Sequence, residues 1–372
     1  DALPIWTALT LTNAGLTSYG SIELQDANVK LTGNIKNVTQ TTLEADEDIE
    51  ILNNPNTNAT VSLTGANMKS NNGDIILTNT SFSFTGDNNR YTWGQGNRLS
   101  AKNITIDNAQ NAKASVSLST GNVEADTMDI TNTSAVKLNK LWVLGTMGGL
   151  NTLTIDNTKN VTMTDVSADR INLSNAATVS IKNSGMADLS VTDSPKVNIT
   201  NADMDAGYFT NVQNLTVANS VFWNEVELAG GKTKVLDKGT KKQKVSYAAN
   251  AAVTNTNFKS DLTADNVFLT INKGNRVSGN LIVSDSYDAE HEEGLDKVNA
   301  TRVLIKDNLA VSALNLDQGT VEVSAKKTLA TTAGINMGQY SDLLLNGVAE
   351  GAITSHLGGK VSIANNAARI YG

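Results

Sequence analysis

The sequence of 372 residues contains no cysteine, only 3 prolines, and few aromatic or charged residues, at 5% and 18%. The absence of cysteine excludes disulfide scaffolds, zinc sites with cysteine ligands, iron–sulfur clusters and thiol nucleophiles. The apolar runs, such as residues 75–77, are far shorter than the ~20 residues that a membrane-spanning helix needs. We therefore expect no membrane insertion by this segment.

Asparagine and threonine are abundant instead, with 47 and 43 residues. Asparagine is a poor helix former that favours turns, and threonine favours strands. The composition therefore predicts β-structure with many tight turns and excludes a helical bundle. The 28 glycines bring the apolar share close to that of globular chains, so disorder is not expected.

The net charge of the chain is acidic, at −8, with an isoelectric point near 4.9. An acidic chain is repelled by phosphate backbones, so nucleic-acid binding is not expected. The first residues, Asp1 to Pro4, include no basic region. We expect that a signal peptide either has been removed or was never there.

A repeat of 18 residues between Leu153 and Phe222 determines the expected architecture. Residues of the same kind recur at this spacing, up to four times in one column. The apolar columns include Val161, Val179, Val197 and Leu215; Met163, Ile181, Ile199 and Val217; and Ala168, Met186, Met204 and Phe222. The repeat predicts a fold built from stacked, equivalent units.

Each repeat contains short strands, because apolar residues alternate with single polar residues, as in Val161-Thr162-Met163. Three such strands fall near 153–155, 161–163 and 166–168. One unit cannot enclose a core, so each strand must pair with the same strand one turn away, in a parallel β-solenoid. The apolar positions lie eight and ten residues apart rather than every six, which argues against the left-handed hexapeptide helix. Together with the handedness of parallel crossovers, this favours a right-handed parallel β-helix.

Two polar columns mark the turns of this solenoid. The columns are Asp165, Asn183, Asn201 and Asn219, and Asn157, Asn175, Asp193 and Asn211. Asn and Asp tolerate positive φ best among residues with a side chain. Stacked in register, their side chains are expected to form hydrogen-bonded ladders between neighbouring turns.

Similar apolar–polar–apolar strands ending in Asn, Asp or Gly recur outside the best block, with irregular spacing. We therefore expect one all-β domain over residues 1–372, with an N-terminal cap at 1–20 that includes Trp6. Loops are expected to interrupt it at 229–250 and 284–299. Trp223 follows an apolar column and is predicted to be structural.

This Asn-, Thr- and Gly-rich, cysteine-free and acidic coil pattern resembles the passenger regions of bacterial autotransporters (type V secretion) and of filamentous-haemagglutinin-like adhesins. The resemblance covers composition and coil pattern over most of the chain, without a unique motif. It implies a protein at the cell surface of a Gram-negative bacterium, or secreted, that acts in adhesion, self-association, biofilm formation or virulence. The membrane barrel and long signal of such proteins are not among these residues.

The first candidate site is the segment 232–244, which has six lysines and one aspartate in an acidic chain. Its lysines are Lys232, Lys234, Lys238, Lys241, Lys242 and Lys244. Such a loop can bind anionic glycans or an acidic partner surface. The alternative is a solvated hairpin whose lysines protect a strand edge.

The segment 285–296 has the opposite charge, with six carboxylates and His291. The carboxylates are Asp285, Asp288, Glu290, Glu292, Glu293 and Asp296. Their spacing matches no EF-hand loop, so we predict no metal site. The segment can instead meet the lysine-rich segment of a second molecule, an association that salt weakens. The alternative is an independent solvated loop.

The third candidate is the aromatic cluster of Arg90, Tyr91, Trp93 and Arg98, which two glycines mark as a loop. Exposed aromatic rings can stack on sugar faces, and arginine binds carboxylates, so the cluster is a candidate glycan site. Alternatively, Trp93 fills a gap beneath a loop.

An enzyme is the alternative function, because β-helices also host polysaccharide lyases and hydrolases. Asp169 and Asp205 share a column, about 9–10 Å apart at the strand spacing, near the ~6.5–9.5 Å of inverting glycosidases. Ala187 occupies the turn between them, and the chain has only two histidines, His291 and His356. We therefore predict a binding protein without cofactor or catalytic residues. Its expected partners are host or matrix glycans or proteins, or copies of itself.

Overall fold

The computed structural model describes residues 42–55, 60–86, 98–146, 151–230, 249–285, 301–355, 358–364 and 366–372, together with the backbone of the strands within residues 7–39. The described residues form strands, turns and bends, and none of them lies in an α-helix. Among them, no helix is long and apolar enough to cross a membrane. The chain divides into two compact units, Asp1–Ala187 and Asp188–Gly372.

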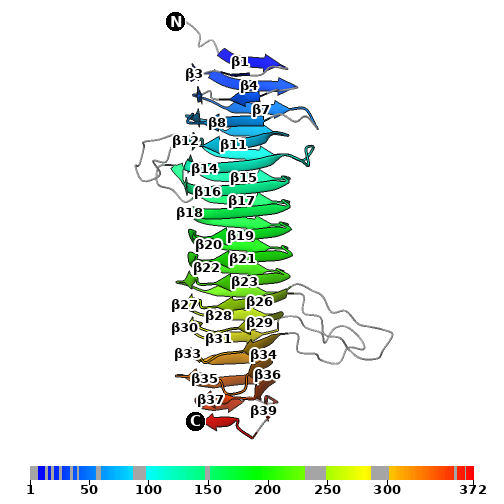
Figure 1. The fold of residues 1–372 in the computed structure, drawn as a ribbon, viewed down its shortest axis with the longest axis vertical. Coiled ribbons are helices and arrows are strands. Elements are labelled where there is room, and N and C mark those ends of the chain that lie inside the picture. The colour runs from blue at the N-terminus through cyan, green and yellow to red at the C-terminus, as the bar shows by residue number, and fades with distance from the viewer. Residues whose placement is uncertain are drawn as a thin grey trace, which may run out of the picture. The chain divides into compact units, whose positions relative to one another are not determined.

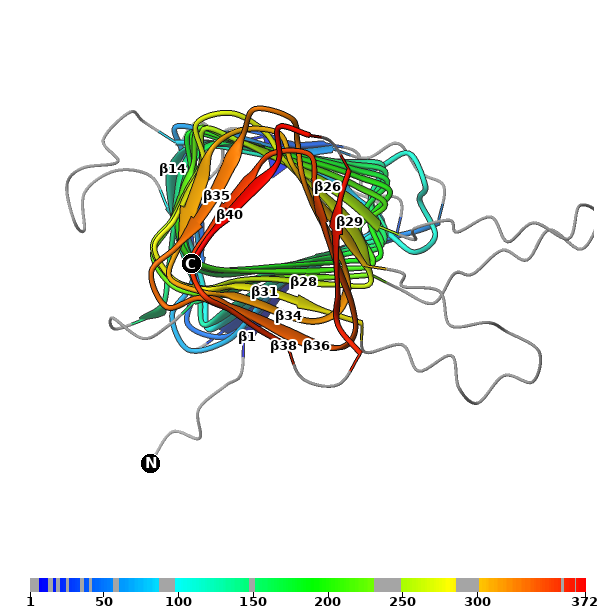
Figure 2. The ribbon, with the colours of Figure 1, turned by 90° about the horizontal axis from the view of Figure 1, so that it is seen from below.

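The strands of the first unit wind in coils and stack as three parallel faces (Figures 1 and 2). The first face contains β1 (Thr7–Thr12), β4 (Ala27–Gly33), β7 (Ile49–Asn53), β10 (Ile75–Thr78), β13 (Asn103–Asp107), β15 (Thr127–Thr131) and β17 (Thr152–Asp156). The second face contains β2 (Leu16–Thr17), β5 (Asn37–Thr39), β8 (Thr60–Thr64), β11 (Ser81–Thr85) and β19 (Thr178–Lys182). The third contains β3 (Ser21–Leu24), β6 (Thr42–Ala45), β9 (Met68–Ser70) and β12 (Arg98–Ser100). The long strands β14 (Ser115–Glu124), β16 (Ala135–Leu144) and β18 (Asn160–Ser174) bend from one face into the next.

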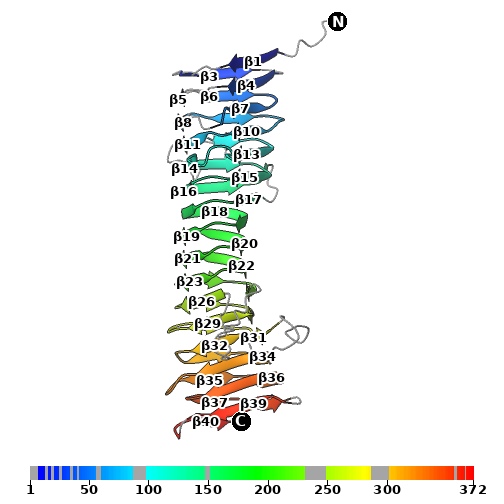
Figure 3. The same ribbon diagram turned by 90° about the vertical axis from the view of Figure 1, so that its right-hand side faces the viewer.

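The second unit also consists of stacked parallel strands (Figure 3). One face contains β21 (Lys196–Thr200), β23 (Asn214–Ala218), β26 (Ala249–Thr254), β29 (Val267–Ile271), β32 (Arg302–Ile305) and β39 (Lys360–Ile363). A second contains β24 (Val221–Phe222), β27 (Asn257–Phe258) and β30 (Arg276–Val277), and a third contains β25 (Val226–Ala229), β28 (Leu262–Asp265), β31 (Leu281–Ser284) and β38 (Ile353–Ser355). The strands β22 (Asp203–Thr210), β34 (Leu314–Val323) and β36 (Ile335–Leu345) serve two faces. A separate sheet holds β33 (Leu309–Val311), β35 (Thr328–Thr331), β37 (Val348–Glu350) and β40 (Arg369–Tyr371), and β20 (Gly185–Thr192) contains the boundary between the units.

The strand register confirms the predicted right-handed parallel β-helix. In the part of the chain that the structure describes, every strand pair is parallel. In the central coils the partners lie 18 residues apart, since Thr152 pairs with Arg170 and Lys196 pairs with Asn214. Other coils are longer, because residues are inserted at their corners.

The core of each unit consists of the inward-pointing residues of these strands. On β17, Leu153 and Ile155 are completely buried, while the residues between and beside them are half-buried. Their partners on the next coil are Ile171 and Leu173, so like residues stack on like. Because side chains alternate across a strand, the period-two pattern of the sequence places every second residue in the core.

Candidate functional site

The corner between the first and second faces of the first unit is built from tight turns. Residues 132–134 connect β15 to β16, and residues 157–159 connect β17 to β18. Each turn begins with an asparagine in the left-handed region, at φ 58° for Asn132 and 49° for Asn157, and Asn175 follows at 51°. Asparagine adopts this conformation more readily than most residues with a side chain, because its short amide bonds to nearby groups. Each of these successive coils therefore places one asparagine side-chain amide on the outside of this corner.

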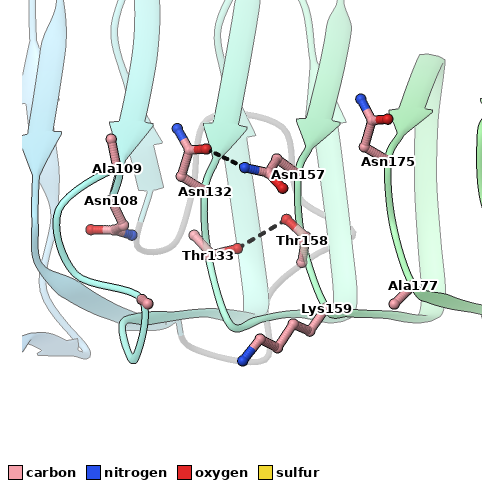
Figure 4. Close-up of a pocket in the computed structure, with 10 residues that line it drawn as sticks. Asn108, Ala109, Asn132, Thr133, Asn157, Thr158, Lys159, Asn175 and Ala177 are labelled. Atoms are coloured by element: carbon pink, nitrogen blue, oxygen red, sulfur yellow. Dashed lines mark hydrogen bonds between the residues drawn. The ribbon is translucent and has the colours of Figure 1, made fainter.

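These amides are hydrogen-bonded from coil to coil. The Nδ2 of Asn157 donates to the Oδ1 of Asn132 at 2.6 Å (Figure 4). The Nδ2 of Asn132 in turn donates to Asp107 at 2.8 Å. The Nδ2 of Asn175 donates to Asp156 at 2.8 Å. Each amide thus turns its nitrogen toward the preceding coil. The corner is a rigid row of side-chain dipoles that all point in one direction.

A second row of polar groups lies beneath this ladder. Thr133 and Thr158 are buried, and their Oγ1 atoms are 3.1 Å apart, within hydrogen-bond distance (Figure 4). The Oγ1 of Thr158 also donates to the carbonyl of Asp156. Buried hydroxyl groups need such partners, since an unpaired one costs about 1–3 kcal/mol. The inner row therefore fixes the floor of the corner.

An insertion interrupts this corner one coil earlier. Residues 108–114 connect β13 to β14, where later coils use three-residue turns. The insertion folds as two consecutive turns, in which Asn111 N–H donates to the carbonyl of Asn108 and Ala114 N–H donates to that of Asn111. It is tied to the preceding coil, because the Nδ2 of Asn111 donates to the carbonyl of Asn79 at 3.2 Å and Gln110 N–H donates to the Oδ1 of Asn79 at 3.0 Å.

The insertion and the turns that follow enclose a groove of about 330 Å³ (Figure 4). Ala109 and Ala112 of the insertion form one end, and the exposed Ala177 lines it three coils further on. Side-chain amides, threonine hydroxyls and the exposed Lys159 form the rest of the lining. The groove therefore has both polar and apolar lining atoms, and among the described residues no carboxylate side chain lines it.

Asn108 is the most deeply buried of the described polar residues that line this groove, with 1% of its surface exposed. Its Oδ1 accepts a hydrogen bond of 2.7 Å from the backbone N–H of Thr80, which determines how the amide is oriented. The Nδ2 then lies on the side of Thr133, and nothing in the described part of the chain accepts a hydrogen bond from it (Figure 4). The wall of the groove therefore contains a buried donor that has no acceptor among the described residues.

Asp156 borders the same corner. Burial raises the pKa of its carboxyl, but hydrogen bonds from the Ser174 hydroxyl, the Asn175 amide and the backbone of Asn157 lower it more. The pKa therefore lies below its ordinary value, and the group is a carboxylate at neutral pH. Its Oδ1 accepts the hydrogen bonds of Ser174 at 2.5 Å and Asn175 at 2.8 Å, so this oxygen belongs to the framework of the corner.

A second candidate lies in the other unit, at Trp223. The sequence predicts a structural role for this residue, and the structure places it outside the core, because 53% of Trp223 is exposed. Trp223 follows the buried Phe222, so the alternation of the strand turns it outward. Its Nε1 donates to Asp203 at 2.6 Å, and the Nζ of Lys259 lies 5.7 Å from the ring centroid. The indole is exposed but held in one orientation.

Carboxylates lie on the same stretch of chain as this indole and on the strand that pairs with it, and we call the set the Trp223 surface. Its members are Trp223, Lys259, Tyr208, Asp203, Asp205, Glu225 and Glu227. The hydroxyl of Tyr208 donates to Glu225 at 2.8 Å. This hydrogen bond, then burial and the charges of Glu225, Asp188 and Glu227 raise the pKa of Tyr208 above its ordinary value. The raised pKa of Tyr208 therefore reflects first its hydrogen bond to Glu225, and the neighbouring negative charges add to it.

All eight residues of the predicted ladder columns have positive φ, between 49° and 54°. Of the aromatic cluster, Arg98 lies on β12, where its Nη1 is 3.4 Å from Glu124. The other three members, Arg90, Tyr91 and Trp93, are outside the described residues.

Most of the charged candidates also fall outside the described residues. These are the lysines of segment 232–244, the carboxylates Asp288, Glu290, Glu292, Glu293 and Asp296, both histidines, and Trp6. Asp285 is described, half-buried, directly after β31. In the described ranges, no group of three or more His, Asp or Glu residues is placed to hold a metal ion.

Of the two carboxylates weighed for an enzyme, that of Asp169 has a structural partner. The Oδ2 of Asp169 accepts a hydrogen bond from the backbone N–H of Asn151 at 3.2 Å, within the first unit. Asp205 lies in the second unit, on β22, and its backbone carbonyl accepts a hydrogen bond from Asn224 at 2.6 Å. Neither contact singles out a pair of acid and base groups.

Sequence reasoning missed both Asn108 and the Trp223 surface. The one available signal for the groove was spacing, since Val116 lies ten positions after Ile106 whereas Val136 lies six positions after Ile130. No family model matches this chain, and comparisons with curated proteins and with solved structures return no significant match. The candidate sites therefore rest on their own geometry.

Proposed function

We propose that this chain is an adhesive module of a bacterial surface or secreted protein, and that it associates with copies of itself through the Trp223 surface. The observation that supports this most is the 53% exposure of a tryptophan that Asp203 holds in place. The resemblance of the coil pattern to autotransporter passengers supports the location at the cell surface.

Trp223 has the properties of an interface anchor. Tryptophan is enriched among the residues that carry most of the binding energy of protein interfaces. Here the hydrogen bond to Asp203 and the contact with Lys259 already restrict the side chain. Little rotamer entropy is then lost on binding, which favours affinity.

The charge of the Trp223 surface indicates which partner it favours. Its carboxylates attract cations, and the indole face binds ammonium groups, as its contact with Lys259 illustrates. The segment 232–244 of a second copy offers six lysines and one aspartate. Complementary charge of this kind speeds encounter and selects the partner, and salt weakens it.

The test is sedimentation velocity of the whole chain over a wide concentration range, at low and at moderate salt. The expected result is reversible association that weakens as salt increases. Trp223→Ser and the combined change Lys241→Ser, Lys242→Ser and Lys244→Ser are each expected to shift association to at least ten-fold higher concentration.

Lys196→Ser is the matched control, because Lys196 is an exposed lysine of the same unit outside the segment. It should associate like the unchanged chain. The thermal midpoint of each variant is measured as well. An unchanged midpoint shows that a loss of association comes from a lost contact and not from unfolding. A monomer at every concentration and salt would contradict self-association, and so would association that the Trp223 change leaves intact.

A further inference from the structure

We infer that the groove between the 108–114 insertion and the following turns is a saccharide-binding site, in which the Nδ2 of Asn108 donates to a sugar oxygen. This site lies in the first unit and shares no residue with the Trp223 surface, so it does not depend on self-association. A volume of about 330 Å³ is at the lower end of the range of small-ligand pockets, which suits one or two sugar rings.

The unsatisfied donor of Asn108 is the first argument. A buried N–H without an acceptor costs about 1–3 kcal/mol, so such groups are rare unless a ligand or water completes them. Asn275 of the second unit shows the ordinary solution to the same problem. Its Oδ1 also accepts a backbone N–H, that of Thr256, but its Nδ2 donates to the carbonyls of Val253 and Asn272. The Oδ1 of Asn108 likewise accepts the backbone N–H of Thr80, but among the described residues no carbonyl accepts a hydrogen bond from its Nδ2.

The acceptors of the groove are the second argument. The ladder uses the Nδ2 of Asn157 and of Asn175 for the preceding coil, and within the described residues nothing donates to the Oδ1 of either. These oxygens can accept sugar hydroxyl protons. Asn108 at one end thus offers a donor, and the ladder offers acceptors, which matches a ligand with both hydroxyl and ring oxygens.

The geometry of the groove also suits a chain of sugars. It spans four successive coils, which is about 14 Å at the ~4.8 Å spacing of strands. The groups that line it repeat at that spacing, and hydrogen bonds to both neighbouring coils hold them. A site that is ordered before binding loses little entropy when the ligand arrives.

Lys159 determines which saccharides bind best. It is exposed, it lines the groove, and no carboxylate lines the groove with it. The nearby Asp107 and Asp156 each direct one oxygen, Oδ1, into the corner, where Asn132 and Asn175 donate to them. A sugar that carries a carboxylate, such as a uronate, can therefore pair with the ammonium of Lys159.

The test is a glycan array that carries neutral, uronate-containing and sialylated oligosaccharides, probed with the whole chain, followed by titration calorimetry of each positive glycan. We expect binding to carboxylated saccharides, with weaker binding to their neutral counterparts. Ala177→Trp fills the groove from an exposed position and should abolish binding. Lys159→Gln should lower the affinity for carboxylated saccharides alone, by about ten-fold, while the matched Lys182→Gln should change nothing.

Asn108→Ser tests the donor itself. Serine can still accept the Thr80 N–H, since the Oγ of Ser184 accepts that of Val166 elsewhere in this unit, at 3.2 Å. It lacks the Nδ2 donor, so a loss of at least ten-fold in affinity with an unchanged thermal midpoint supports the inference. Binding to no saccharide on the array would overturn it and leave a water-filled groove. Binding that Ala177→Trp leaves unchanged would overturn it as well.

Discussion

The side-chain oxygen of Asn108 accepts a hydrogen bond of 2.7 Å from the backbone N–H of Thr80 on the preceding coil. Both groups are buried, so this bond contributes to stability as well as to the shape of the groove. Asn108→Ala should lower the free energy of unfolding by about 1–3 kcal/mol, because the Thr80 N–H would lose its acceptor. Urea denaturation measures the change. Asn108→Ser should leave the free energy of unfolding nearly unchanged, and a cost equal to that of Asn108→Ala would count against this role.

Asn157 combines positive φ with a ladder hydrogen bond, and two substitutions separate these contributions. Asn157→Gly keeps the backbone conformation and loses only the 2.6 Å bond to Asn132. Asn157→Ala loses the bond and also strains the backbone, since L-residues in the left-handed region cost about 1–2 kcal/mol. The alanine variant should therefore be less stable than the glycine variant by about 1 kcal/mol in urea unfolding. The reverse order would show that the left-handed turn is not needed there.

Gly207 has no room for a side chain in the second unit. A Cβ there would lie 2.7 Å from Cε1 of Phe222 and 2.9 Å from Cε2 of Phe209. Phe222 cannot yield easily, because it is buried and stacks on Phe258 with ring centroids 5.4 Å apart. Gly207→Ala should therefore destabilise the protein by about 1–3 kcal/mol, the usual cost of overpacking. Calorimetry checks this against Lys196→Ala as an exposed control, and a midpoint equal to that control would disprove it.

Asp156 makes stability depend on pH. Its pKa in the folded protein lies below that of the unfolded chain, because the hydrogen bonds of Ser174, Asn175 and Asn157 together outweigh the effect of burial. The stabilisation is thus present above the unfolded pKa of about 4 and is lost as pH falls through the folded value. The difference in thermal midpoint between the unchanged chain and Asp156→Asn should be largest above about pH 5 and shrink in acid. A constant difference across this range would refute the assignment.

The ionisation of Tyr208 on the Trp223 surface depends on its hydrogen bond to Glu225. Its hydrogen bond to Glu225, its burial and the nearby carboxylates raise its pKa, so its hydroxyl should ionise at higher pH than a free tyrosine. The absorbance difference between the unchanged chain and Tyr208→Phe at 295 nm, followed through alkaline pH, isolates this group. Glu225→Gln should move its titration to lower pH. No movement would mean that Glu225 does not control the ionisation of Tyr208.

The sequence by itself determined the coil. The 18-residue columns predict the pairing of Val161 with Val179 and of Val197 with Leu215, and the structure contains both pairs. The positive φ of Asn157 and Asp165 was also predictable from residue type, at 49° and 54°. Such features depend on local periodicity and on intrinsic backbone preferences, which one repeat already displays.

Only the tertiary structure decided where the candidate sites lie. The unsatisfied donor of Asn108 arises because Thr80, distant in sequence, lies beside it and occupies its oxygen. Trp223 and its neighbour Phe222 are both aromatic, but successive side chains along a strand point to opposite faces. Phe222 is therefore buried, while Trp223 is exposed. Insertion of residues 108–114 changes one corner and leaves the coil intact. The donor of Asn108 and the shape of its groove depend on contacts between neighbouring coils. An irregular repeat in the sequence does not specify which residues make those contacts.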